Sequence, residues 1–320
     1  MHIPDGFLDA RTAATAAALS IGGLGLAVRR ARVQLPARKV PLMGLAAAFV
    51  FAGQMLNFPV AGGTSGHLVG GVLCGVLLGP SAAVLVISCV LIVQCLAFGD
   101  GGVLALGANI FNMAIVSAVG GYAIYRGLHR IFPGERGRLL AVAVASWAAT
   151  VAAAVVCAGQ LALSGTAPWS VTLPAMAWVH MLIGVGEAII TTLVVASIAR
   201  SRPELLDAAR PAPSRGAELL LFGGLIALGL ALFVAPFASA LPDGLDHAAT
   251  LLGFAARERH VLAKAPLAEY HLPGVQSPAL ATALAGGIGT VLMFAIAWAM
   301  ARLLVRAERN GPQPTEAPGA

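Results

Sequence analysis

The sequence has little charge and few aromatic residues. Asp, Glu, Lys and Arg make up 11% of the 320 residues, aromatic residues 6% and apolar residues 58%, and the mean hydropathy is +0.87. A soluble domain carries about 25% charged residues, so this composition excludes an ordinary soluble protein and indicates an integral membrane protein. The apolar runs reach the roughly 20 residues that a helix needs to cross a bilayer, and they are too long and unbroken for β-barrel strands.

Several motifs of catalysis and export are also missing. The chain has no Walker A loop, no Gly-x-Ser-x-Gly turn and no His-Glu-x-x-His helix, so we expect neither an ATPase nor a hydrolytic centre, and not an enzyme. The four cysteines show no Cys-x-x-Cys spacing, which argues against a disulfide framework or a thiolate metal site. Asp5 and Asp9, rather than a basic segment, precede the first apolar run, so no cleavable signal peptide is expected.

Nine apolar segments are candidate transmembrane helices, and we predict an all-α polytopic membrane protein. They span residues 10–28, 40–56, 67–79, 81–98, 103–125, 139–163, 171–199, 216–240 and 278–302. The third segment is short and glycine-rich, and only Gly79 and Pro80 separate it from the fourth.

Lysine and arginine gather in alternate loops. If the nine helices simply alternate, only Arg11, Arg257, Arg259 and Lys264 of the twenty basic residues fall on one side. Cytoplasmic loops carry the excess of Lys and Arg, so we expect the amino terminus outside and the carboxyl terminus in the cytoplasm. The net charge of +6 reflects this bias and does not indicate a nucleic-acid partner. The other basic residues are Arg29, Arg30, Arg32, Arg38, Lys39, Arg126, Arg130, Arg136, Arg138, Arg200, Arg202, Arg210, Arg215, Arg302, Arg306 and Arg309.

The first two residues offer three nitrogen ligands on one short piece of backbone. The α-amine of Met1, the amide nitrogen of His2 and the His2 imidazole can close fused chelate rings around one divalent ion. Ni(II) and Cu(II) favour nitrogen ligands in a square plane, and His67 is the candidate for the fourth position. The site requires an unblocked amino terminus, and the bulky second residue predicts that Met1 is retained. A lone histidine at position 2 usually carries no function, so the hypothesis depends on the rest of the chain.

Residues 57–67 contain Pro, Gly, Ser and Thr and cannot be helical throughout. We expect a loop that dips into the outer mouth with His67 at its base, because irregular backbone at membrane depth is tolerated where protein buries it or it lines a cavity. The expected topology puts the amino terminus on the same face. Five polar residues around the expected ligands are candidates for orienting the imidazoles by hydrogen bonds. They are Gln54, Asn57, Thr64, Ser65 and Asn109.

His180 and Glu187 are polar groups two turns apart within one apolar segment. Ionisable groups inside a membrane usually face the bundle interior and often mark a pathway, and a spacing of seven puts both on one helix face. They are candidates for metal transit, with a structural hydrogen bond between helices as the alternative. His247, His260 and His271 lie in the 241–277 segment, where presenting metal and simple solvation both stay open.

Several irregular motifs resemble those of a known family. Met-His-Ile-Pro-Asp-Gly-Phe at 1–7, residues 48–60 and residues 62–67 are similar to the substrate-binding membrane subunit of cobalt/nickel energy-coupling-factor (ECF) transporters, which are ABC transporters. The resemblance covers about residues 1–200 and includes 78–80, 98–102, 107–112 and 180–187. It implies a square-planar site made by the Met1 amine, the His2 amide and imidazole, and the His67 imidazole, with Ni2+ or Co2+ as the transported substrate.

Residues 216–305 resemble the small two-helix companion subunit of the same transporters. The signature is Pro-Asp-Gly-Leu-Asp at 242–246, where the family usually has Glu in the last place. We expect a metal-capturing component at 1–200, a cytoplasmic linker at 201–215, the companion at 216–305 with an external loop at 241–277, and a polar tail at 306–320. In the family this loop assists metal loading. The outward acidic residues here, which would attract cations, are Asp243, Asp246, Glu258 and Glu269.

The resemblance also implies partners and a location. The partners are a transmembrane coupling subunit and two cytoplasmic ABC ATPases, and the location is the cytoplasmic membrane of a prokaryote. Two rival functions stay open. A self-sufficient channel or proton-coupled divalent-metal carrier would use His180 and Glu187 as its relay and would need no ATPase. A membrane hydrolase would need an open metal position for water, which four in-plane nitrogens do not readily leave. Nickel and cobalt suit the same ligands, and neighbouring genes for urease, hydrogenase or cobalamin synthesis would separate them.

Overall fold

The apolar segments form long helices in the structure, a computed structural model that describes residues 1–207, 216–259 and 265–309. Short π-helical stretches continue α4 and α9, and another joins α5 to α6. The helices are α1 (Ala10–Gln34), α2 (Val40–Gln54), α3 (Gly71–Leu78), α4 (Pro80–Val93), α5 (Leu106–Asn109), α6 (Gly121–Ile131), α7 (Gly134–Leu163), α8 (Trp169–Ser201), α9 (Gly216–Gly229), α10 (Gly244–Leu251) and α11 (Pro278–Arg309), and the strands are β1 (Phe58–Val60) and β2 (Thr64–Gly66).

Seven helical segments of the described chain are long and apolar enough to cross a membrane, which confirms a polytopic helical membrane protein. Two of the nine expected segments form shorter helices, because α2 has 15 residues and α3 has 8. Nearly every residue of α2 is buried, whereas the outer helices expose apolar side chains such as Ile21 on α1, 71% exposed, and Leu193 on α8, 62% exposed. Such an outward apolar surface suits lipid rather than water.

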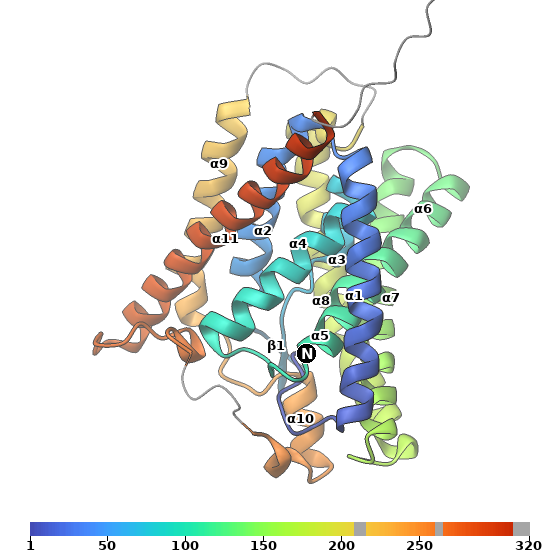
Figure 1. Ribbon diagram of the computed structural model, residues 1–320, viewed down its shortest axis with the longest axis vertical. Coiled ribbons are helices and arrows are strands. Elements are labelled where there is room, and N and C mark those ends of the chain that lie inside the picture. The colour runs from blue at the N-terminus through green and yellow to red at the C-terminus, as the bar shows by residue number, and fades with distance from the viewer. Residues whose placement is uncertain (208–215, 260–264, 310–320) are drawn as a thin grey trace, which may run out of the picture.

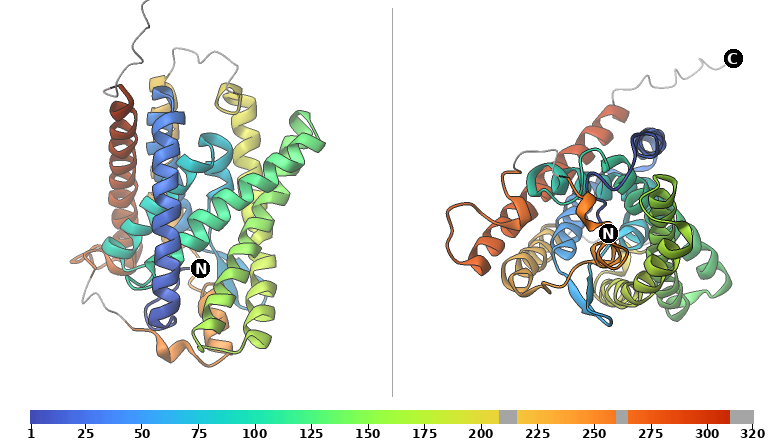
Figure 2. Two further views of the ribbon diagram at one scale, coloured as in Figure 1. Left: turned by 45° about the vertical axis from the view of Figure 1, so that its right-hand side comes forward. Right: turned by 90° about the horizontal axis from the view of Figure 1, so that it is seen from below.

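The ends of the molecule differ in charge. In Figure 1, α1 rises from the end that holds α10 to the opposite end, where α8 and α11 finish and α9 begins. The basic residues at the end of α1, at the end of α6 and at the end of α8 therefore gather away from α10. The amino terminus lies on the side of α10, and the view from below places it near the middle of the molecule (Figure 2).

Residues 58–66, which we expected to be an irregular loop, form a small antiparallel hairpin. Phe58 pairs with Gly66 and Val60 with Thr64, and two glycines with positive φ, Gly62 and Gly63, make its tip. Glycine is needed there because other residues rarely adopt this conformation. The exposed tip leads into a buried second strand, and this strand delivers His67 to the interior. The following helix begins at Gly71 rather than at the expected residue 67.

The carboxyl-terminal helices pack around the buried α2. Both α9 and α11 contact it, while α10 lies against α8 and β2. Residues 238–259 cross beneath the hairpin and the amino terminus, where Ser239 N donates to Asn57 O at 2.8 Å and Ser65 N donates to Pro242 O at 2.8 Å. The segment that carries the Pro-Asp-Gly-Leu motif is therefore joined to the first 67 residues by backbone hydrogen bonds.

Candidate metal centre

The first residues of the chain enter the interior without forming a helix, and every second side chain from Met1 to Phe7 is buried. Ile3 is fully buried and Phe7 is 1% exposed. The carboxamide of Asn109 fixes residue 3 from both sides, because Ile3 N donates to its Oδ1 at 2.8 Å and its Nδ2 donates to Ile3 O at 3.1 Å. Gly102 N also donates to Ile3 O, at 2.9 Å. The position of Met1 and His2 thus depends on backbone contacts one residue further along.

Asp5 holds the same segment with its side chain. Its carboxyl oxygens accept from the backbone N–H groups of Val103, Leu104 and Ala105 at 3.1, 2.8 and 3.2 Å. Gly102 is required at this crossing, since a Cβ there would lie 2.2 Å from Asp5 Oδ1. This arrangement satisfies a buried carboxyl group and clamps the amino-terminal segment to the 99–105 turn.

The turn that carries His67 is held from α8. The two carboxyl oxygens of Glu187 accept from Val69 N at 2.7 Å and Gly70 N at 2.9 Å, and Gln54 Nε2 donates to Val69 O at 3.1 Å. Gly70 has a φ of +77°, which lets the chain leave this turn directly into α3. The two side chains fix the backbone just after His67.

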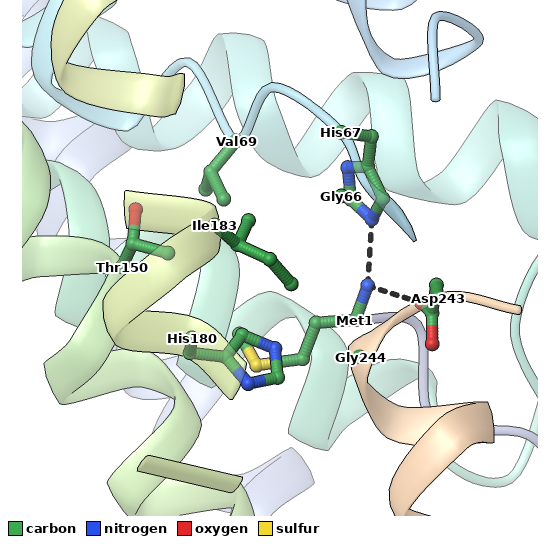
Figure 3. Close-up of a pocket in the computed structure, with 9 residues that line it drawn as sticks. All are labelled: Met1, Gly66, His67, Val69, Thr150, His180, Ile183, Asp243 and Gly244. Atoms are coloured by element: carbon green, nitrogen blue, oxygen red, sulfur yellow. Dashed lines mark hydrogen bonds and ion pairs between the residues drawn. The ribbon is translucent and has the colours of Figure 1, made fainter. Parts of the chain in front are cut away.

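Met1 and His67 meet at their nitrogen atoms. The Met1 amine lies 2.6 Å from His67 Nε2 (Figure 3), and His67 Nδ1 lies 3.0 Å from Leu68 O. Because a carbonyl oxygen only accepts, Nδ1 donates, and the lone pair of Nε2 points at the amine. The rings of His2 and His67 are stacked with centroids 5.1 Å apart and an interplanar angle of 21°. The structure therefore gathers the three residues in which the sequence predicts nitrogen ligands.

Two aspartates hold these nitrogens. The Met1 amine donates to Asp243 Oδ2 at 2.7 Å, and His2 Nδ1 lies 3.1 Å from Asp100 Oδ1. Asp243 also caps α10, where its Oδ1 accepts from Leu245 N and Asp246 N at 2.8 and 2.9 Å. Asp100 accepts from the Tyr270 hydroxyl at 2.6 Å. The amine of Met1 and the imidazole of His2 are thus each paired with a carboxylate, and Asp243 and Tyr270 come from beyond α9.

The electrostatics favour a neutral imidazole beside a charged carboxylate. Burial, followed by the nearby amine charge, lowers the pKa of His67 to about 3. Burial, together with the amine, also lowers the pKa of His2, which Asp100 opposes. For Asp243 burial acts against ionisation, but the amine and His67 lower its pKa below the usual range. Both imidazoles are therefore available as metal ligands near neutral pH, since a ligating histidine must be deprotonated.

Four of the five predicted orienting residues contact backbone rather than imidazole. Asn109 binds Ile3, and Gln54 binds Val69. Ser65 Oγ donates to Leu241 O at 2.7 Å, and Thr64 Oγ1 donates to Pro242 O at 3.1 Å. These hydroxyls join the hairpin to the distal segment. The fifth, Asn57, takes part through its main-chain oxygen, which accepts from Ser239 N.

His180 and Glu187 share a helix face, yet they contact different groups. His180 Nδ1 lies 2.8 Å from Met176 O within its own helix, and its ring lies beside the Met1 side chain in a cavity of about 10 Å³ (Figure 3). Glu187 supports the His67 turn, as described above. A hydrogen bond from α8 to another element is therefore present at Glu187, and it runs to a turn rather than to a second helix.

Of the other histidines, His247 lies near Asp243 on α10, where its backbone N–H donates to Asp243 O at 2.8 Å. His129 stacks on Tyr125 at a ring distance of 5.7 Å at the other end of the molecule. His271 Nδ1 lies 3.0 Å from Glu269 O on the surface. His260 lies outside the described residues. Within the described ranges no group of three His, Cys, Asp or Glu side chains has the arrangement of a metal site.

Three functional contacts were missed by reading the sequence. Asp5 and Asp100 lie within the motifs described above. Asp5 binds the backbone of the 99–105 turn and Asp100 binds the His2 imidazole, and the spacing of residues in the sequence predicts neither contact. Tyr270 lies 170 residues beyond Asp100. A lone aspartate among glycines in an apolar protein was the available signal for Asp100, because an ionisable group in such a chain usually has a partner.

Comparisons with known proteins identify both halves of the chain. The family model of the cobalt uptake substrate-specific transmembrane region matches residues 2–205, and that of the PDGLE domain matches residues 217–306. A relative from Archaeoglobus fulgidus, by name a fused nickel transport protein, is 40% identical over 94% of this chain and 98% of its own length. The fused nickel transport protein of Rhodobacter capsulatus is 38% identical over 71% of this chain and 70% of its own. A solved structure of a truncated transition metal transporter is 36% identical, with a TM-score of 0.57 over 62% of this chain and 99% of that chain.

Proposed function

Because the chain belongs to the cobalt uptake substrate-specific transmembrane family and carries a PDGLE domain, we propose that it captures Ni2+ or Co2+ outside the cell for ATP-driven uptake. Members of this nickel and cobalt transport family are transport proteins rather than enzymes. The observation that carries the proposal is the 2.6 Å approach of the Met1 amine to His67 Nε2 beside the stacked His2 ring. In this proposal residues 1–200 capture the ion and residues 216–305 assist.

The ion would take four nitrogens. The Met1 amine and the His2 amide nitrogen close a five-membered ring around it, and the amide and His2 Nδ1 close a six-membered ring, since three carbons separate these two nitrogens. His67 Nε2 supplies the fourth position. His2 Nδ1 faces Asp100 and the amine faces Asp243, so the ion replaces both contacts as it binds. The amine and the His2 amide would each release a proton, and the proton on His2 Nδ1 would leave or move to Nε2. Nitrogen ligands of this kind suit Ni(II), and Co(II) can use the same set.

The direction of transport follows from the charge distribution. The basic loops would lie in the cytoplasm by the positive-inside rule, which puts the amino terminus and α10 outside the cell. In this proposal the short helices α2 and α3 also lie in the membrane, which gives nine membrane helices. The chain would hand its ion to a transmembrane coupling subunit driven by two cytoplasmic ABC ATPases in a prokaryotic cytoplasmic membrane. Binding and reorientation then form a two-state switch that ATP hydrolysis biases.

Metal content tests the proposal. Protein purified with its native amino terminus should hold about one nickel or cobalt ion per chain by mass spectrometry. His67→Ala and a form with one additional residue before Met1 should both lose the metal. The first removes the imidazole ligand, and the second moves the amine away from the His2 amide and imidazole. His129→Ala is the matched control, as it removes an imidazole at the other end of the molecule, and it should keep the wild-type content.

A transport assay separates the proposal from a self-sufficient carrier. Uptake of radioactive nickel into cells should disappear when the ATPase subunits are omitted. Uptake that persists without them would refute the ABC mechanism. Equal metal content in wild type, His67→Ala and the extended form would refute the amino-terminal site.

A further inference from the structure

A wide cavity lies beside the nitrogen cluster and shares His67 and Asp243 with the small Met1 cavity. Its volume is about 660 Å³, and its wall includes residues from both halves of the chain. The rim is formed by exposed residues such as Leu241, Pro242 and Glu269, whereas Gln54 and His67 at its base are buried. The cavity therefore leads from the surface to the predicted metal ligands.

The described wall of this cavity is acidic. Four carboxylates line it, and no lysine or arginine is among those wall residues. Partial burial and repulsion by the neighbouring Asp243 raise the pKa of Asp246 to about 7, and a cation bound nearby would favour the charged form of this carboxyl group. The four are Asp100, Asp243, Asp246 and Glu269.

A residue of the same wall carries an unsatisfied oxygen. Gln54 lines the cavity and is 4% exposed. Its Nε2 donates to Val69 O, but its Oε1 is buried and has no hydrogen-bond partner among the described groups. A buried acceptor without a donor costs free energy, so a bound water or a hydrated cation is the expected partner of this atom.

Cavity size separates two stages of binding. Six waters at about 30 Å³ each occupy roughly 180 Å³, so a fully hydrated divalent ion fits within the 660 Å³ of the outer cavity. The inner cavity beside Met1 measures about 10 Å³, which is near the lower limit for one water. His67 and Asp243 line both cavities. Because a hydrated ion does not fit the inner cavity, it must lose its water shell beside these two residues.

We propose that the outer cavity is an acidic vestibule that holds a hydrated divalent cation before dehydration at His67 and Asp243. This inference rests on the proposed function. The carboxylates bind the ion through its waters, and Gln54 Oε1 accepts from one of these waters. Asp243 then exchanges its contact with the Met1 amine as the ion passes to the nitrogens. The loading rate thus depends on the vestibule, whereas the dissociation rate depends on the nitrogens.

Stopped-flow loading of the full chain with Ni2+ in detergent tests this inference. The double variant Asp246→Asn, Glu269→Gln should load about three- to tenfold more slowly at low salt, because steering by charge raises association rates. Its nickel content at saturating metal and its dissociation rate should match wild type, so its equilibrium affinity should fall only by the factor by which loading slows. Glu135→Gln is the matched control, since it removes an exposed carboxylate at the opposite end, and its loading rate should not change.

Competition by Mg2+ gives a second readout. Mg2+ prefers oxygen ligands and keeps its waters, so it should occupy the vestibule without taking the nitrogen site. At equal ionic strength it should slow nickel loading of wild type more than NaCl does, and this difference should vanish in the double variant. Equal loading rates in wild type and the double variant, with normal nickel content in both, would overturn the vestibule alone. A wild type that takes up no nickel would overturn the proposed function and the vestibule together.

Discussion

Glu187 should control the metal affinity of the site without touching the ion. Its carboxyl oxygens accept two backbone N–H groups at 2.7 and 2.9 Å, at a position that is 2% exposed. Glu187→Ala leaves both N–H groups buried without their partners, at about 1–3 kcal/mol each. The turn that presents His67 then loses roughly 2–6 kcal/mol of its stability in this conformation. Because affinity falls with the fraction of competent molecules, we expect nickel affinity to drop at least about tenfold, the equivalent of about 1.4 kcal/mol.

Two further variants make the reasoning testable. Glu187→Gln keeps one acceptor oxygen and should lose less affinity than the alanine variant. Thr191→Val, one turn further along α8, removes a buried hydroxyl whose oxygen has no hydrogen-bond partner among the described groups, and it should bind nickel as wild type does. Equilibrium titration of protein with a native amino terminus measures all three. Wild-type affinity in Glu187→Ala, with the protein still folded, would refute the claim that the His67 turn requires this carboxyl group.

Three other outcomes are expected. Gly102→Ala should lower both the melting temperature and nickel binding, because its Cβ would lie 2.2 Å from a carboxyl oxygen of Asp5. Gly25→Ala is the control, since a Cβ there meets nothing within 4 Å, and it should leave both unchanged. Equal effects of the two variants would contradict the role of Asp5 in fixing the amino-terminal segment. Asn109→Leu removes both hydrogen bonds to Ile3, and amine-reactive reagents should then label the Met1 amine faster than in wild type. Folding lowers the pKa of His67 from 6.5 to about 3, so between these pH values the unfolded chain binds a proton at His67 and the folded chain does not. The free energy of unfolding without metal should therefore fall as the pH drops from 6.5 towards 3. His67→Gln should flatten this slope of melting temperature against pH, and an unchanged slope would contradict the assignment.

The candidate nitrogen ligands could be chosen from the sequence because their chemistry is local. An amine, an amide and an imidazole on Met1 and His2 form a chelating set in any chain that begins this way, and the topology derived from the arginines puts His67 on the same face. The long helices could be predicted for a similar reason, since apolar length alone determines whether a segment can span a bilayer.

The supporting contacts could not be predicted, because their partners carry no side-chain signal. Glu187 binds the backbone of Val69 and Gly70, and any residue presents the same N–H groups. Ser65 and Thr64 bind main-chain oxygens about 176 residues away, a distance over which one sequence gives no pairing. The strands Phe58–Val60 and Thr64–Gly66 have three residues each, which is too short for an alternating pattern to stand out.

The bonds between residues 64–65 and 241–242 join two parts of a single polypeptide. Tethering gives the second part an effective concentration that reaches the millimolar range for short flexible linkers, whatever the level of expression. A few hydrogen bonds of modest intrinsic affinity then suffice to keep residues 241–242 in contact with the hairpin beside the amino terminus. Covalent fusion also ensures one such partner for every site. An interface maintained in this way can stay weak enough to open and close repeatedly, because each opening leaves the partner within reach.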